Sequence, residues 1–139
     1  MAVTPTPVYA QAVNNGVQSF ANADGQTKKT IFTAGANGSR LTEILVSSTD
    51  TSARDIVVGI TVSATNYDLF IVNIPITAGT VNSAPTVSYL KQAQCPGMAL
   101  DAYGNPYLDL PSGTTVYAYA PVSVTAAKQI NVWAMGANY

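Results

Sequence analysis

The chain has 139 residues, of which 47% are hydrophobic and only 9% are charged, and its formal net charge is −1. This composition excludes a disordered chain, which needs low hydrophobicity and high net charge, and so little charge favours a molecule whose surface is covered by other subunits. The six Lys and Arg residues are scattered without forming a basic stripe, which argues against nucleic acid as the main partner.

The sequence shows neither a membrane-spanning segment nor the pattern of a secretion signal. No apolar run approaches the ~20 residues of a membrane-spanning helix. The first residues, MAVTPTPVYAQ, lack the basic and apolar regions of a secretion signal. Cys95 has no second cysteine to pair with. We therefore expect a protein with no internal disulfide, no secretion signal and no membrane partner.

Residues 1–20 are predicted to form an N-terminal extended arm. Pro5 and Pro7 disfavour a helix there, and Asn14-Asn15-Gly16 indicates a turn or a bulge. Such an arm is either frayed or laid across a neighbouring subunit.

Two strands follow, each preceded by turn residues. The dipeptide Asp24-Gly25 predicts a tight turn before a strand at 29–33. A glycine-rich turn at 35–38 precedes a strand at 40–48, and the polar run 47–52 is predicted to be a surface loop. On the second strand we expect Ile44 and Val46 on one face, and Leu41 and Leu45 on the other.

The segment 54–76 predicts the central hairpin of the fold, because two apolar runs flank the polar tetrad 64–67. The second run is apolar on both faces, which is typical of a central strand, and pairing should end near Pro75, which has no N–H to donate. In the first run, Ile56, Val58, Ile60 and Val62 share the face that we expect to be buried. In the second run, one face has Phe70, Val72, Ile74 and Ile76, and the opposite face has Leu69 and Ile71.

Residues 77–111 are predicted to be a long irregular connection rich in Pro and Gly. Within it, 87–93 forms either a short strand or one helical turn. Long loops in compact domains usually carry function or contacts.

Two alternating strands are predicted at 116–124 and 130–139. If they pair, one sheet face is small and aliphatic, and the other is aromatic. The aromatic face is either buried within the sandwich, packed on another subunit or used to stack sugars. It comprises Tyr117, Tyr119, Trp133 and Met135.

Short strands about ten residues apart indicate one all-β domain over residues 1–139, a single antiparallel β-sandwich that is jelly-roll-like. Val58, Ile60, Phe70, Val72, Val116 and Val132 are the expected core.

Catalytic chemistry has few candidates, because the chain has no histidine. A carboxylate pair, Asp101 and Asp109, lies in one irregular segment and could support glycoside hydrolysis or, with Asn105, a calcium site. The alternative is that both acids make hydrogen bonds within turns. We expect no enzyme, no cofactor and no metal. Arg54-Asp55 is predicted to be a local ion pair, and Lys28-Lys29 a solvated strand end.

Two stretches, DGQTKKTIFTAGANGSRLTEILVSSTDTSARDIVVGI and LDAYGNPYLDLPSGTTVYAYAPVSVTAAKQINVWAMGANY, resemble small virion structural proteins of tailed bacteriophages. The nearest class is the capsid cement or decoration protein. This resemblance implies a jelly-roll or sandwich protein on the capsid exterior, assembled in the host cytoplasm. Its implied partners are the major capsid protein and further copies of itself, as a homodimer or homotrimer.

An alternative function is a binding module associated with a tail or head fibre, an adhesin for a glycan or receptor. Both functions depend on exposed aromatic, proline and methionine side chains rather than on catalysis. The candidate interface residues are Pro5, Pro7, Tyr9, Tyr103, Tyr107, Tyr117, Tyr119, Trp133, Met135 and Tyr139.

Overall fold

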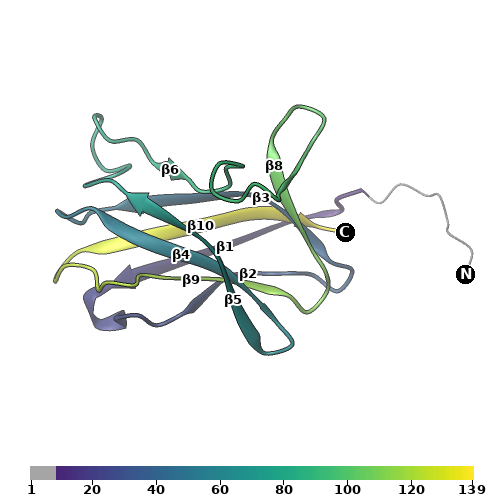
Figure 1. The fold of residues 1–139 in the computed structure, drawn as a ribbon, viewed down its shortest axis with the longest axis horizontal. Helices are drawn as coiled ribbons and strands as arrows, with labels where there is room; N and C mark the ends of the chain where they lie inside the picture. The colour runs from purple at the N-terminus through teal and green to yellow at the C-terminus, as the bar shows by residue number, and fades with distance from the viewer. Residues whose placement is uncertain (1–8) are drawn as a thin grey trace, which may run out of the picture.

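A computed structural model describes residues 9–139, which form two antiparallel sheets packed face to face (Figure 1). Sheet A has the strand order β1-β10-β3-β8-β7, with β6 also paired to β3, and sheet B has the order β2-β9-β4-β5. Sheet A contains β1 (Ala12–Ala21), β3 (Ser39–Ser48), β6 (Val87–Ser88), β7 (Ala99–Leu100), β8 (Pro106–Leu110) and β10 (Gln129–Asn138). Sheet B contains β2 (Lys29–Thr33), β4 (Arg54–Val62), β5 (Thr65–Ile74) and β9 (Thr115–Tyr119).

The predicted all-β sandwich is confirmed, and the strand order is that of a jelly roll. When the two-residue strands β6 and β7 are set aside, eight strands remain. The chain crosses between the two sheets at every connection except the β4–β5 hairpin, as in two interleaved Greek keys. A short 3-10 turn, η1 (Asn22–Asp24), carries the chain from β1 in sheet A to β2 in sheet B, and Gly25 follows it with a φ of 55°. This turn is the one that Asp24-Gly25 predicted.

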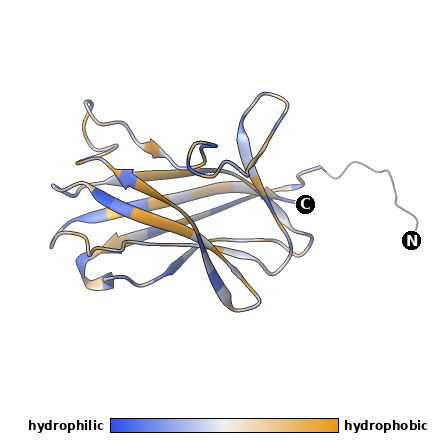
Figure 2. Ribbon diagram, in the orientation of Figure 1, coloured by the Kyte–Doolittle hydropathy of each residue, from blue (hydrophilic) through white to orange (hydrophobic). Residues whose placement is uncertain are grey.

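The core lies between the sheets and is formed by buried hydrophobic residues from both of them. Figure 2 shows hydrophobic segments on the strands of both sheets. Five of the six predicted core residues are buried, and Ile60 is partly buried against the same cluster. Tyr89, just after β6, is also fully buried, and its hydroxyl donates to the Val72 carbonyl over 3.2 Å. Because that hydroxyl is satisfied, a tyrosine is tolerated in the core.

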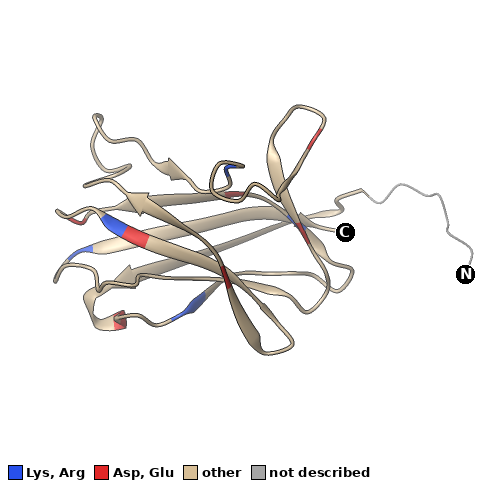
Figure 3. Ribbon diagram, in the orientation of Figure 1, with Lys and Arg blue, Asp and Glu red and all other residues tan. Residues whose placement is uncertain are grey.

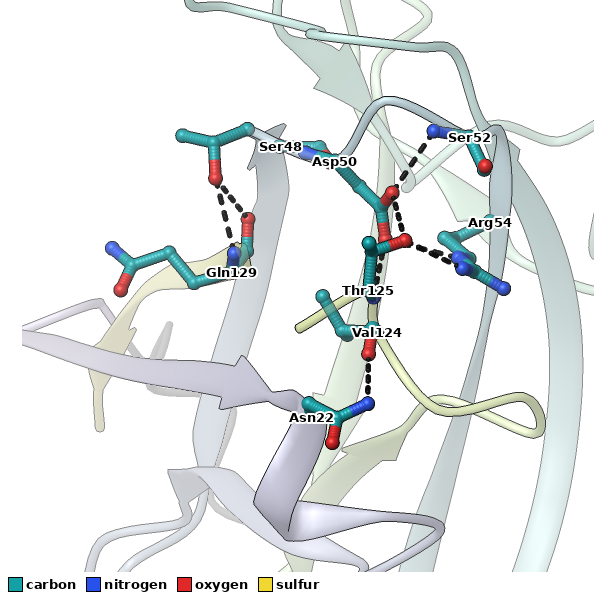
Figure 4. Close-up of polar contacts among 9 residues, drawn as sticks. Asn22, Ser48, Asp50, Ser52, Arg54, Val124, Thr125 and Gln129 are labelled. Atoms are coloured by element: carbon teal, nitrogen blue, oxygen red, sulfur yellow. Dashed lines mark hydrogen bonds and ion pairs between the residues drawn. The ribbon is translucent and has the colours of Figure 1, made fainter. Parts of the chain in front are cut away.

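At one end of the sandwich, the buried carboxylate of Asp50 connects two loops by hydrogen bonds (Figure 4). Its oxygens accept hydrogen bonds from the Arg54 Nε at 2.9 Å, from the Thr125 hydroxyl at 2.7 Å and from the backbone N–H groups of Ser52 and Thr125 at 2.9 Å each. Burial raises the pKa of Asp50, but these donors outweigh it and hold the pKa below its usual value. The β3–β4 and β9–β10 connections are thereby joined.

Two predictions fail at this end of the molecule. Residues 47–52 are not simply a surface loop, since Ser48 and Asp50 are buried. Arg54 pairs with Asp50 instead of Asp55, whose carboxylate accepts a hydrogen bond from the Asn73 amide at 2.9 Å. Adjacent residues on a strand point to opposite faces, so Arg54 and Asp55 cannot meet there.

The predicted arm is wrong for residues 12–20, which belong to β1, while residues 9–11 are outside regular structure. Asn14, Asn15 and Gly16 continue the strand without a turn. Gly16 is required by a close approach of the two sheets, because a Cβ there would lie 1.9 Å from the Ile31 carbonyl oxygen of β2. Pro5 and Pro7 lie outside the described residues.

Three local details differ from the predicted pattern. Leu41 is buried on the same side as Ile44, because a bulge at Thr42 shifts the register between β3 and β10. The β4–β5 turn is at Ser63-Ala64, where both φ angles are positive, as in a primed hairpin turn. Strand β5 lies at the edge of sheet B instead of its centre, although it does end just before Pro75 as predicted.

Segment 77–111 is mostly irregular, as predicted, but it contributes three strands. Within it, Val87–Ser88 forms strand β6, which settles the choice between strand and helical turn. Strands β7 and β8 make a hairpin whose tip projects beyond the packed strands (Figure 1).

Candidate functional site

The predicted aromatic face is divided between the two sheets. Strands β9 and β10 do not pair, since β9 lies between β2 and β4 while β10 lies between β1 and β3. Tyr117 and Tyr119 therefore lie on the outer side of sheet B, and Trp133 and Met135 on the outer side of sheet A. The prediction of one aromatic surface from both strands is wrong, and two separate surfaces replace it.

Trp133 is the centre of an apolar row across the outer side of sheet A. In the strand register it is paired with Val17 of β1 on one side and with Leu45 of β3 on the other. Its neighbours Val132 and Ala134 are fully buried, so Trp133 faces outward, and 53% of it is exposed. Val17 is 60% exposed and Met135 is partly buried on the same side.

We define the Trp133 face as the outward side chains of β1, β10 and the β3 segment opposite them. Strands β1 and β10 carry no charged residue along their whole length (Figure 3). An exposed, uncharged row with a tryptophan at its centre has the composition of an interface core, where charge is depleted and Trp and Met are enriched. Its uncharged members are Val13, Asn15, Val17, Ser19, Leu45, Ser47, Asn131, Trp133 and Met135, and Glu43 of β3, the register partner of Met135, adds one carboxylate at its border.

A second cluster lies where β8 meets β3, and it unites Tyr107 and Tyr139 of the predicted set. The Arg40 guanidinium carbon lies 3.8 Å from the Tyr107 ring centroid and 5.9 Å from that of Tyr139. Asp109 accepts two hydrogen bonds from Arg40, at 2.9 and 3.2 Å, and one from the Tyr139 hydroxyl. Burial raises the pKa of Asp109, but the hydrogen bonds from Arg40 and Tyr139 together lower it by more. The pKa of Asp109 is therefore below its usual value.

Beside this cluster is a polar pocket of about 540 Å³. Its walls include an aromatic ring, two carboxylates, an amide and hydroxyl groups, which could hydrogen-bond a hydroxyl-rich ligand. Tyr103, on the hairpin that forms one wall, is 91% exposed. The pocket is lined by Arg40, Thr42, Glu43, Ser88, Leu90, Asp101, Asn105, Pro106 and Tyr107.

Asp101 and Asp109 do not face each other across a cleft. Asp101 accepts hydrogen bonds from the backbone N–H groups of Tyr103 and Asn105, both at 2.8 Å, and the bond from Asn105 leads the effects that lower its pKa. The interpretation of Asp101 as a turn residue is thus confirmed, whereas Asp109 holds Arg40. Within residues 9–139, no group of three or more His, Cys, Asp and Glu side chains could hold a metal ion.

The third cluster lies on the outer side of sheet B. The Tyr117 and Tyr119 rings are stacked with centroids 6.4 Å apart, and Lys28 Nζ lies 4.6 and 5.2 Å from them. Both hydroxyls donate to the Asp68 carboxylate. The hydrogen bond from Tyr117 is the largest of the effects that lower the pKa of Asp68. Lys28 therefore belongs to a cluster of side chains and is not simply a solvated strand end.

Of the other predicted interface residues, Tyr9 is 73% exposed just before β1. The sequence pattern did not identify Val13 and Val17, because β1 was interpreted as an arm. Nor did it identify Arg40, which only the β3–β8 pairing brings to Tyr107. In the described part of the chain, no helix is long and apolar enough to cross a membrane. No protein-family model and no curated protein sequence matches this chain.

Proposed function

We propose that this protein is a virion structural protein, a capsid cement subunit that stabilises a bacteriophage head by binding across major capsid protein subunits. The observation that carries the proposal is the Trp133 face, a sheet surface with no charge on β1 or β10 and a half-exposed tryptophan in its middle strand. The resemblance of the sequence to small phage virion proteins supports the same function. In this proposal the protein acts on the capsid exterior, is assembled in the host cytoplasm, and needs neither a cofactor nor a catalytic step.

The expected energetics fit a contact of this kind. Burying the exposed half of one tryptophan, of order 130 Å², contributes roughly 3 kcal/mol at about 25 cal/mol per Å². No ion of β1 or β10 has to be desolvated in the contact, and Glu43, at the border of the face on β3, already accepts a hydrogen bond from Ser88. Binding should therefore change little with moderate salt.

The jelly-roll topology is compatible with the proposal but does not carry it. Jelly rolls occur in viral capsid proteins and in lectins alike, and one fold hosts many functions. The choice between a capsid protein and a lectin must therefore be argued from the surface residues.

The test is sedimentation of particles from producing cells through a density gradient, with the chain quantified by mass spectrometry. We expect it to co-migrate with megadalton particles at hundreds of copies per particle. Trp133→Lys should abolish co-migration, because it places a charge in the centre of the contact.

Ile71→Lys is the matched control, since Ile71 is equally exposed, at 53%, but lies on the outer side of the other sheet. This variant should co-migrate like the wild type. Migration of the wild-type chain as a free small oligomer, or unchanged binding of Trp133→Lys, would overturn the proposal.

The polar pocket favours a second candidate function, a glycan-binding module associated with a tail or head fibre. Its ring, carboxylates and amide suit sugar hydroxyls, and the exposed Tyr103 stands beside it. A glycan array with isolated protein tests this function. Saturable binding that Tyr103→Ala weakens, while Tyr67→Ala on sheet B leaves it intact, would support it over the first. An array without any binding would remove it.

A further inference from the structure

The outermost strands of a sheet have one unpaired edge, which can accept another strand. Here the edge strands are β1, β6 and β7 in sheet A, and β2 and β5 in sheet B. Natural proteins protect such edges with shortness, charge, proline or a bulge. The edges of this molecule differ sharply in how far they are protected.

All of these edge strands except β1 carry at least one of these protections. Strands β6 and β7 are only two residues long. Strand β2 includes Lys29 and has a register shift between Thr30 and Phe32. Strand β5 carries Asp68 and a bulge at Leu69, which has no partner in β4. None of these four strands offers a long, regular, uncharged backbone.

Strand β1 has none of the four protections. It runs for ten residues, contains no charged residue and no proline, and keeps continuous register with β10 over its whole length. Val13 is 80% exposed and Val17 is 60% exposed. At one end, Lys29 Nζ donates to the Ser19 carbonyl oxygen at 2.7 Å, and the Asn14 amide donates to the Thr33 carbonyl oxygen of β2 at 2.8 Å. The part of the edge beyond the Lys29 contact is Ala12 to Gln18. Within residues 9–139, no strand pairs with this edge.

We propose that the β1 edge is a self-association site, at which β1 of a second copy adds antiparallel about a two-fold axis. Such a contact is isologous, because each β1 meets the identical strand, and backbone hydrogen bonds supply most of its specificity. A second copy is the occupant that the structure favours. It presents an edge of the same length with no charge, so no ion is buried unpaired when the two strands meet.

The pairing also enlarges the Trp133 face. Three ten-residue strands at ~3.3 Å per residue and ~4.8 Å spacing make a flat area of roughly 460 Å², less than the ~800 Å² per partner of a standard interface. Joining two copies through β1 makes one continuous sheet and doubles this area to roughly 900 Å². The dimer therefore offers a surface of standard size where one copy does not.

This inference does not depend on the proposed function, because it concerns the free protein. The first measurement is sedimentation equilibrium of the purified full chain. We expect a mass twice the 14.4 kDa of one chain, and loss of the dimer in the double variant Val13→Lys/Val17→Lys, in which like charges meet across the two-fold axis. Ile71→Lys, on sheet B, should stay dimeric. Circular dichroism checks that each variant is folded.

Trp133→Lys separates edge pairing from packing of one Trp133 face on another. Edge pairing leaves this variant dimeric, whereas face packing makes it monomeric. Hydrogen exchange of the wild type gives a second readout. Within residues 12–18, the alternate amides that point away from β10 should exchange at least tenfold more slowly in the dimer than after dilution to monomer, while those bonded to β10 are protected in both states. The inference is overturned if the wild type is a monomer at every concentration or a trimer. It is also overturned if Trp133→Lys is a monomer, or if hydrogen exchange in β1 does not depend on protein concentration.

Discussion

The ring of Tyr117 lies directly over the backbone of Gly59 on the outer side of sheet B. A Cβ placed on Gly59 would be 2.4 Å from both Cζ and the hydroxyl oxygen of Tyr117. The two residues are partners in the β4–β9 register, so the ring crosses to the neighbouring strand and reaches Asp68 on β5 beyond it. Glycine is needed here for space, because the backbone of Gly59 has an ordinary φ.

We expect Gly59→Ala to lower the free energy of unfolding by about 1–3 kcal/mol, since the added methyl group displaces the Tyr117 ring. Urea denaturation followed by circular dichroism measures this change. Gly97→Ala is the control, because a Cβ at Gly97 meets nothing within 4 Å and should leave stability nearly unchanged. Equal effects of the two substitutions would contradict this account of Gly59.

Asp50→Asn should cost about 3–5 kcal/mol of stability at neutral pH, because it leaves Arg54 without its buried partner. The pKa of Asp50 in the folded protein lies below its usual 3.8. The stabilisation by this carboxylate is therefore fully present above pH 4, and it is lost as the pH falls from there toward the folded pKa.

Urea denaturation of both proteins at pH 7, 5 and 3 checks the linkage. The difference in unfolding free energy between wild type and Asp50→Asn should be constant from pH 7 to 5 and smaller at pH 3. A difference that stays the same at all three values would show that the carboxylate charge does not contribute.

Asp109→Asn should have a much smaller effect than Asp50→Asn, although Asp109 also binds an arginine. The side chains of Arg40 and Asp109 are 36% and 50% exposed, so solvent screens the pair and its contribution is about 1 kcal/mol or less. Thermal denaturation of both variants under identical conditions makes the comparison. If Asp109→Asn lowers the melting temperature as much as Asp50→Asn does, solvent exposure does not determine how much these two ion pairs stabilise the protein.

Val72→Asp should prevent soluble folding, because Val72 is buried between the sheets and a carboxylate there has no partner. Ile71→Asp is the control on the adjacent residue, which faces outward with 53% of it exposed. The yield and melting temperature of the two variants are measured side by side. A folded Val72→Asp protein would show that the register of β5 is wrong.

Much of the fold could be predicted because period-two alternation shows directly which residues face a core. Phe70, Val72 and Val116 were placed in the core from that pattern alone, and the jelly-roll class followed from the spacing of strands and turns. The pattern failed at Leu41, where a bulge shifts the alternation, and along β1, whose polar residues hide its periodicity. Bulges and half-exposed edge strands depend on neighbouring strands, which a single segment cannot reveal.

The candidate functional residues can likewise be separated into those that the sequence identifies and those that only the tertiary structure brings together. Composition determined that the chain is charge-poor and without histidine. Local pattern determined that the chain is all-β and that Trp133 and Met135 share a face. Only the tertiary structure decided that Tyr117 and Tyr119 belong to the opposite sheet and that Val17 and Leu45 flank Trp133. It also brought Arg40 to Tyr107, and Asp50 to Thr125 across 75 positions of sequence. The physical reason is that alternation is a property of one strand, whereas strand order is set by how two whole sheets bury their apolar faces.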